Sequence, residues 1–256
     1  MTASMLRSTA GFLLGLALLV VPALAFVARH ADGREPPARH DFFPPPHLAS
    51  DGRYRIVAFG SSSTRGFGAS RPGAAYPARL QAIFDAAAPR AGITVVNRGV
   101  DGDYSDGMVA RIDDDILPRR PSLVVWQLGS NDALFSIDPA HFEANLRTGL
   151  ARLRAAGTAV LLVGPQWNPG SGAPFEAMNA VVRAVSRETG VPFLDRSALM
   201  RRWIGSGALR AEDIIGPDGL HPSDQGYGLI ARAVFEAAVL QVPGLRARLA
   251  APGASG

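Results

Sequence analysis

From residue 53 onwards, short apolar runs alternate with longer stretches in which apolar residues recur at helical spacing. The candidate strands are residues 55–59, 93–97, 123–128, 159–164 and 191–194, and the candidate helices are residues 74–88, 105–116, 139–156, 174–189 and 223–240. This alternation favours a parallel sheet with helices on both faces, and the strand runs are almost wholly apolar, as expected when both faces are covered. The sequence therefore predicts an α/β fold with three α/β/α layers and a doubly wound parallel five-stranded sheet.

The N-terminal segment has the features of an export signal. Arg7 precedes residues 8–28, which contain no charged residue, and "VPALA" closes the apolar core with Ala23 and Ala25 in an A-x-A arrangement. A positive flank, an apolar core and small residues at its end are typical of a secretory signal peptide, although about 20 uncharged residues can also span a bilayer. We expect residues 1–28 to be a signal peptide, with cleavage favoured after Ala25, or an N-terminal membrane anchor. The protein is then exported, as a periplasmic, secreted or membrane-anchored protein.

The rest of the chain divides by composition and pattern. Residues 29–52 are rich in proline, and such segments stay extended, so we expect a linker there. The strands and helices occupy residues 53–245, a normal length for one domain. Residues 246–256 are expected to form a flexible C-terminal tail.

Composition excludes several classes of site. The chain has no cysteine, which rules out disulfides, thiolate nucleophiles and cysteine-bound metals. All 26 basic residues are arginines, and they are scattered instead of forming a stripe with interleaved aromatic residues, so nucleic acid is not an expected partner. His40 and His47 lie in the proline-rich segment without regular ligand spacing. No metal site and no cofactor is therefore predicted.

Polar segments follow the first three predicted strands, and a fourth precedes the last predicted helix. These segments read "FGSSSTRGFG", "NRGVDG", "LGSND" and "DGLHPSD". In open parallel sheets, ligands bind beyond the carboxyl ends of the strands, so we expect the four segments to meet at one edge. They supply serine hydroxyls, glycine backbone N–H groups, an asparagine amide, and a histidine with an aspartate three residues before it. These are the parts of a nucleophilic acyl-transfer site.

In this order, the four segments resemble the sequence blocks of the SGNH (GDSL-like) hydrolase family. The matching residues are Gly60, Ser62, Thr64, Gly66, Phe67 and Gly68, then Asn97, Gly99 and Gly102, then Gly129, Asn131 and Asp132, and finally Asp218, His221 and Pro222. The resemblance covers about residues 54–240 and departs from the family where Ser61 replaces an aspartate. It implies a flavodoxin-like catalytic domain over residues 53–245. It also implies a lipase- or lysophospholipase-type serine esterase that hydrolyses small-molecule carboxylic esters or thioesters through an acyl-enzyme.

The resemblance assigns a catalytic triad. Ser62 stands two residues after Gly60, where the family has its nucleophile, and a serine hydroxyl needs a base within hydrogen-bond reach. His221 is the expected base, because the ordinary histidine pKa of about 6.5 suits proton transfer near neutrality. Asp218 is expected to hold the imidazole tautomer and to stabilise the imidazolium. Taken singly, "SSST" and "PDG" are equally typical of a helix cap and a turn.

Further residues of the expected site stabilise charge or contact the substrate. The backbone N–H groups of Ser62 and Gly99 and the side chain of Asn131 are expected to form the oxyanion hole. Asp132 is expected to cap a helix or to orient its loop. Trp167, in the loop "PQWNPGSG" after the fourth strand, either lines a pocket for the acyl or alcohol group or is an exposed loop aromatic.

Other functions are less well supported by the sequence. The chain lacks the G-x-S-x-G turn of α/β-hydrolases, a P-loop and a convincing G-x-G-x-x-G dinucleotide motif. A non-catalytic carbohydrate or lipid binder on the same fold remains the alternative, and the serine at position 61 is its only support. Fold alone does not decide between an enzyme and a binder.

Overall fold

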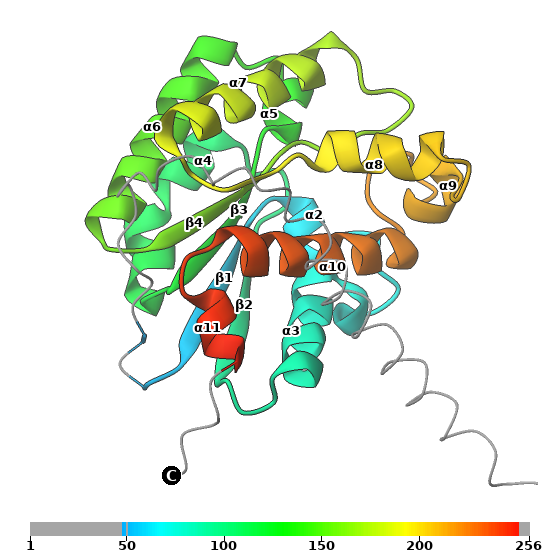
Figure 1. The fold of residues 1–256 in the computed structure, drawn as a ribbon. Helices are drawn as coiled ribbons and strands as arrows, with labels where there is room; N and C mark the ends of the chain where they lie inside the picture. Colours follow the sequence, from blue (N-terminus) through cyan, green and yellow to red (C-terminus); the bar gives the residue numbers. More distant parts are fainter. Residues whose placement is uncertain (1–47, 50, 251–256) are drawn as a thin grey trace, which may run out of the picture. The chain divides into compact units, whose positions relative to one another are not determined.

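The computed structural model describes residues 48–49 and 51–250, and its centre is one sheet of five parallel strands in the order β2-β1-β3-β4-β5 (Figure 1). The strands are β1 (Tyr54–Gly60), β2 (Ile93–Gly99), β3 (Leu123–Gln127), β4 (Ala159–Val163) and β5 (Phe193–Leu194). Since β2 lies on one side of β1 while β3 to β5 follow on the other, the winding direction reverses at β1. The predicted doubly wound parallel sheet is confirmed.

Successive side chains of the central strand β1 enter two separate cores. Ile56 and Ala58 pack into one core with helices on the first face, and Val57 and Phe59 pack into the other. The helices of the first face are α3 (Tyr76–Ala87), α10 (Asp224–Gln241) and α11 (Leu245–Ala250). Those of the second face are α4 (Ser105–Ala110), α6 (Pro139–Ala155) and α7 (Ala173–Thr189) (Figure 1). The two cores make the three predicted layers.

Short elements connect these layers. They are α2 (Ser62–Arg65), α5 (Ser130–Leu134), α8 (Arg196–Gly205), α9 (Ala211–Ile214), the 3₁₀ turns η1 (Pro72–Ala74) and η3 (Leu117–Arg119), and the π-helical turn η2 (Ile112–Ile116). The structure therefore divides the single helix predicted over residues 105–116 into α4 and η2. In η2 the carboxylate of Asp115 meets the guanidinium groups of three arginines, Arg98, Arg111 and Arg119. The wider π turn thus coincides with a cluster of ion pairs.

The C-terminal end of the domain differs from the prediction of a flexible tail over residues 246–256. Residues up to Ala250 form α11, whose Leu245 is fully buried in the first core. The guanidinium Nε of Arg248 donates to the carbonyl of Ala91 at 2.7 Å, which ties the helix to the segment before β2. Residues 251–256 lie outside the described part of the chain.

The predicted export segment, residues 1–28, also lies outside the described residues, as does most of the predicted linker over residues 29–52. Among the helices of the described part, none combines the length and the apolar character needed to cross a membrane.

Candidate active site

The chain turns from strand to helix at the first polar segment. β1 ends at Gly60, and α2 begins at Ser62, so this side chain lies at the carboxyl edge of the central strand. A Cβ atom at Gly60 would lie 2.9 Å from the backbone oxygen of Gln127 and 2.8 Å from its side-chain oxygen, which leaves room only for glycine. The backbone N–H of Ser62, in the first turn of α2, has no acceptor among the described residues.

Three side chains form a hydrogen-bonded chain that ends at this serine. The Oγ of Ser62 lies 2.8 Å from Nε2 of His221, and Nδ1 of the same imidazole lies 2.6 Å from Oδ2 of Asp218. The second carboxylate oxygen, Oδ1, accepts the backbone N–H groups of Leu220 and His221 at 3.0 and 2.9 Å. The fold thus brings together residues that are 159 positions apart in the sequence.

The carboxylate of Asp218 is held in its charged form. Burial by itself raises the pKa of a carboxyl group, but the hydrogen bonds from the Leu220 N–H and from His221 outweigh it, so the pKa of Asp218 is lowered. An ionised carboxylate at Nδ1 fixes the proton on that nitrogen and leaves Nε2 as the acceptor facing the serine. This is the arrangement that a base for Ser62 requires.

An aromatic ring covers the histidine. The ring of Phe67 lies 4.5 Å from the imidazole of His221, centroid to centroid, and remains 51% exposed on its other side. The hydroxyl of Tyr227 donates to the Phe67 carbonyl at 2.7 Å and holds this turn against α10. Phe67 belongs to the first matching block, yet the sequence alone did not assign it to the site, since nothing in the pattern shows which way its ring points.

The expected oxyanion donors differ in availability. The Nδ2 of Asn131 donates one hydrogen to the carbonyl of Asp103 at 2.8 Å, and none of the described residues accepts its second hydrogen, which can bind substrate. The N–H of Gly99, in contrast, donates to Oδ1 of Asn97 at 2.9 Å. A Cβ at Gly99 would lie 2.7 Å from the carbonyl carbon of Thr64. Gly99 therefore allows α2 to pack against β2, and because its N–H is already bonded to Asn97, the structure does not support its predicted place in the oxyanion hole.

Gly102, the next glycine of the same block, is better placed to donate. Its φ is +72°, a conformation that favours glycine, and no atom lies within 4 Å of where its Cβ would be. Its N–H has no acceptor in the part of the chain that the structure describes. It also precedes Asp103, the residue whose carbonyl binds Asn131. The signal that distinguishes the two glycines is the side chain of Asn97, which occupies the first N–H.

The three adjacent serines have different partners. The Oγ and the N–H of Ser61 both lie 3.3 Å from Oε1 of Gln127, inside the protein. The Oγ of Ser63 donates to Oε1 of Gln166 at 3.1 Å. Of the three hydroxyls, that of Ser62 is the one that contacts the imidazole, and its role as nucleophile stays a prediction.

Residues 46–234 match the sequence model of the Non-GDSL lipase-like family. The chain belongs to this family. The match confirms the resemblance to SGNH hydrolases, and it extends over all five strands, the four polar segments and the helices up to the middle of α10.

Individual relatives of this lipase-like chain are ester hydrolases. The chain is similar to "Esterase TesA" of Pseudomonas aeruginosa, with 34% identity over 130 residues, 50% of this chain and 61% of that esterase. It is also similar to "Thioesterase 1/protease 1/lysophospholipase L1" of Escherichia coli, with 27% identity over 69% of this chain and 79% of the other. The predicted enzyme class, a hydrolase acting on ester bonds, is confirmed by these relatives.

A solved structure shows the same fold. The crystal structure of the lipase/acylhydrolase from Enterococcus faecalis superimposes with a TM-score of 0.65 at 21% identity. The match covers 79% of this lipase-like chain and 99% of that one. The α/β sandwich with its five-stranded parallel sheet is therefore shared at low sequence identity.

Two further residues named in the sequence analysis, Asp132 and Trp167, are held by contacts inside the protein. Asp132 is fully buried, and its two carboxylate oxygens accept the N–H groups of Ser105 at 3.0 Å and of Gly129 at 3.2 Å. It caps α5 and holds the start of α4, as expected. Trp167 is partly buried and packs against the small cluster around Met200. It is not a freely exposed loop aromatic, and its contact with substrate stays a prediction.

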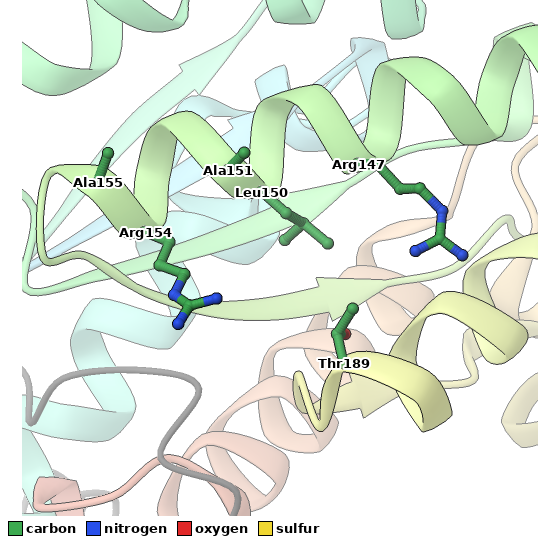
Figure 2. A pocket seen from close by; sticks show the side chains of 6 residues that line it. All are labelled: Arg147, Leu150, Ala151, Arg154, Ala155 and Thr189. Atoms are coloured by element: carbon green, nitrogen blue, oxygen red, sulfur yellow. The ribbon is translucent and has the colours of Figure 1, made fainter.

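A hollow of about 430 Å³ lies elsewhere, along the second half of α6 and the end of α7. Figure 2 shows Arg147 and Arg154 reaching from α6 toward Thr189. The guanidinium of Arg147 already binds Glu143 at 2.8 Å and Glu188 at 2.5 Å. α6 and α7 end just before β4 and β5 begin, so this hollow lies at the amino ends of the strands, away from Ser62.

Proposed function

We propose that the protein is a serine esterase that cleaves carboxylic esters or thioesters through an acyl-enzyme. The observation that carries this proposal is the chain of two hydrogen bonds, 2.8 and 2.6 Å long, from Ser62 through His221 to Asp218. A serine hydroxyl becomes an effective nucleophile when a positioned base removes its proton, and this base is itself oriented by a carboxylate. A protein that only binds ligands has no need of such a chain, so the non-catalytic alternative is not favoured.

The reaction proceeds in two halves. Nε2 of His221 takes the hydroxyl proton as Oγ of Ser62 attacks the substrate carbonyl carbon, and the imidazolium then gives this proton to the leaving alcohol or thiol. Water then attacks the acyl carbon and passes a proton to His221, and the imidazolium gives this proton to Oγ of Ser62 as the acyl–oxygen bond breaks, which releases the acid and restores the serine. The carbonyl oxygen becomes negative in each half, and the N–H groups of Ser62 and Gly102 and the amide of Asn131 are the proposed donors to it.

The surroundings of the serine favour a substrate with an apolar part. Of the six large apolar side chains that are well exposed in the described residues, four lie on the segments that follow β1, β2 and β3: Phe67, Val100, Leu134 and Phe135. These segments begin at the same edge of the sheet as Ser62, the carboxyl ends of the strands. Exposed apolar groups beside a polar site are typical of a ligand-binding surface. We therefore propose a small-molecule ester with an apolar acyl or alcohol group.

The test combines turnover with covalent labelling. The wild-type protein is expected to hydrolyse p-nitrophenyl esters, with kcat/KM rising from acetate to longer acyl chains, since each buried methylene contributes up to about 0.8 kcal/mol. A fluorophosphonate is expected to label Ser62, as read by peptide mass mapping. Ser62→Ala should lose the label and lower kcat by a factor on the order of 10⁶, while Ser61→Ala keeps most activity.

Three results would contradict the proposal. They are a label on Ser61 or Ser63, a Ser62→Ala protein that still turns over, and a folded wild-type protein that hydrolyses no ester or thioester of the panel. An acetyl ester as the best substrate would overturn only the apolar preference.

Export remains a proposal as well. The uncharged residues 8–28 and the A-x-A arrangement at Ala23 and Ala25 support an exported enzyme, either released or tethered to the membrane by this segment.

A further inference from the structure

Gln166 lies in the loop after β4, is only 2% exposed, and makes three hydrogen bonds to three different segments. Its side-chain oxygen accepts the hydroxyl of Ser63 at 3.1 Å, and its side-chain nitrogen donates to the carbonyl of Leu220. Its backbone N–H donates to Oγ of Ser130 at 3.3 Å. One buried residue therefore joins the ends of β1 and β3 to the loop before α10.

Each of these three partners is the immediate chain neighbour of a group in the proposed active site. They adjoin the nucleophile Ser62, the base His221 and the oxyanion donor Asn131, respectively. We propose that Gln166 is a positioning residue that sets the distances among these three groups. This inference rests on the proposed function, and it assigns a role that the four matching sequence blocks do not contain.

The chemistry of the side chain fits this role. The Ser63 hydroxyl offers a hydrogen and the Leu220 carbonyl can only accept one, so the residue between them needs an acceptor and a donor on one planar group. A glutamine amide has both, at a fixed separation. Since Gln166 and Ser63 are both buried, removing the amide would leave the Ser63 hydroxyl without this partner inside the protein, which is costly.

A rigid support lies behind the glutamine. The side chain of Arg196 is buried and donates through Nη2 to the same Ser130 hydroxyl at 3.4 Å and through Nε to the Gly164 carbonyl at 3.1 Å. Gly164 follows directly on β4, and Pro165 then restricts the backbone before Gln166. The amide is thus fixed relative to the sheet, and through it the serine turn and the histidine loop are fixed to the same strand.

The experiment compares two glutamine-to-methionine variants of the full chain. Gln166→Met keeps the length of the side chain and removes its hydrogen bonds. Gln81→Met is the matched control, because Gln81 also joins two elements: it accepts the Val95 N–H at 2.6 Å and donates to the Ile93 carbonyl at 3.1 Å, linking α3 to β2. Steady-state kcat and KM on a p-nitrophenyl ester and the rate of fluorophosphonate labelling are measured for both proteins and for wild type.

Gln166→Met is expected to lower kcat and the labelling rate by about tenfold to a hundredfold, the scale associated with a displacement of reacting groups by about 1 Å. KM should stay within about twofold, because the bound substrate contacts other groups. Gln81→Met should match wild type in both constants at a temperature where all three proteins are folded. A purely structural role predicts equal, small effects of the two variants on kcat.

A folded Gln166→Met protein with kcat within about twofold of wild type would overturn the proposal, as would a rise in KM alone. If that variant does not fold, Ser63→Ala decides, since it deletes one of the three bonds. A fall of several-fold in kcat supports the role, and an unchanged kcat refutes it. Failure of the proposed function itself is recognised separately, because it would show as an inactive, unlabelled wild-type protein.

Discussion

Asn131 presents an amide of which one hydrogen is already bound. Its Nδ2 donates to the Asp103 carbonyl at 2.8 Å, and this bond holds the side chain in place before any substrate arrives. Preorganised donors of this kind stabilise the charge that develops in the transition state more than they stabilise the bound ester. We therefore expect Asn131→Ala to lower kcat by about 10²–10³-fold and to change KM little.

The measurement is steady-state kinetics on an ester substrate, with labelling of Ser62 by a fluorophosphonate as the check that the nucleophile is intact. Asn145→Ala is a suitable control, because this asparagine also donates from its amide to a neighbouring element, the first turn of α4, at 3.0 Å to Oγ of Ser105, and has no proposed role in the reaction. A purified, folded Asn131→Ala protein with unaltered kcat would remove Asn131 from the oxyanion hole.

Position 61 shows how a departure from the family pattern is accommodated. Three donors converge on Oε1 of Gln127: the N–H and the hydroxyl of Ser61 and the hydroxyl of Thr64. The serine that replaces the family's aspartate therefore bonds to a buried acceptor that it shares with Thr64, and the turn that carries Ser62 is held without a carboxylate.

At the level of single residues, the sequence predicted those groups whose residue type and spacing together indicate a catalytic role. A serine, a histidine and an aspartate at family spacing could be assigned to the triad before any coordinates were known. Gly99 and Gly102 could not be told apart, because the choice depends on which N–H is already occupied by Asn97. Gln166 could not be assigned from the sequence, because its proposed role depends on three hydrogen bonds to segments that are remote in the sequence.

Among the elements, α8 is the one whose stability can be tested through its N-cap. It carries the buried Arg196, and its N-cap residue, Asp195, accepts several hydrogen bonds. The carboxylate of Asp195 accepts the Ala198 N–H at 2.9 Å, the Asn179 amide at 3.0 Å and the Arg183 guanidinium at 2.5 Å. Burial alone would raise the pKa of Asp195, but these bonds, that of Arg183 foremost, lower it.

We expect Asp195→Ala to reduce the free energy of unfolding by about 1–2 kcal/mol near neutral pH, the upper part of the range for loss of an N-cap. A carboxyl whose folded pKa is lowered stabilises the fold above its ordinary pKa, and this contribution disappears as the pH falls through the folded value. The difference between variant and wild type should therefore be full at pH 7 and shrink below about pH 4.

Urea unfolding at several pH values measures both effects. Asp138→Ala, which removes the exposed N-cap of α6 with its 2.8 Å bond from the Ala140 N–H, serves as the comparison and should cost about 1 kcal/mol or less. Equal losses in the two variants, or a difference for Asp195→Ala that persists at acid pH, would contradict this account of α8.

The long elements were predictable, whereas α8 was not. The three central strands β1, β3 and β4 and the long helices have apolar residues that the structure buries, while β2 and β5 at the sheet edges are only partly buried. The first turn of α8 buries Arg196 and Ser197 instead, and the apolar Met200 follows alone, so its sequence shows little helical periodicity. A polar side chain can be buried in this way only if it has hydrogen-bond partners. Those of Arg196, Gly164 and Ser130, lie far from it in the sequence, so the local sequence does not predict the helix.

For the molecule as a whole, the prediction concerns its destination in the cell. Residues 8–28 carry no charge and end near an A-x-A arrangement. We expect a full-length tagged chain to be exported, with cleavage after Ala25 if the segment is a signal peptide. Cell fractionation with N-terminal sequencing measures this, and replacing apolar residues of the segment by arginine should block it.

Two outcomes distinguish the possible destinations. A mature chain that begins at residue 26 in the external fraction indicates release, while an intact chain in the membrane fraction indicates an anchor. Intact, soluble chain recovered from the cytoplasm would show that the segment does not direct export.

The separation of 159 positions between the two ends of the Ser62–His221 hydrogen bond also has a consequence in time. A nascent chain that has emerged only as far as β5 already contains the strand, the turn and the nucleophile, but no base. Closing so long a loop is among the last contacts that the domain can make, because the segment before α10 must first return to the start of the sheet. If the proposed triad is correct, the enzyme is inactive throughout synthesis, and acylation of Ser62 requires that nearly the whole domain has folded.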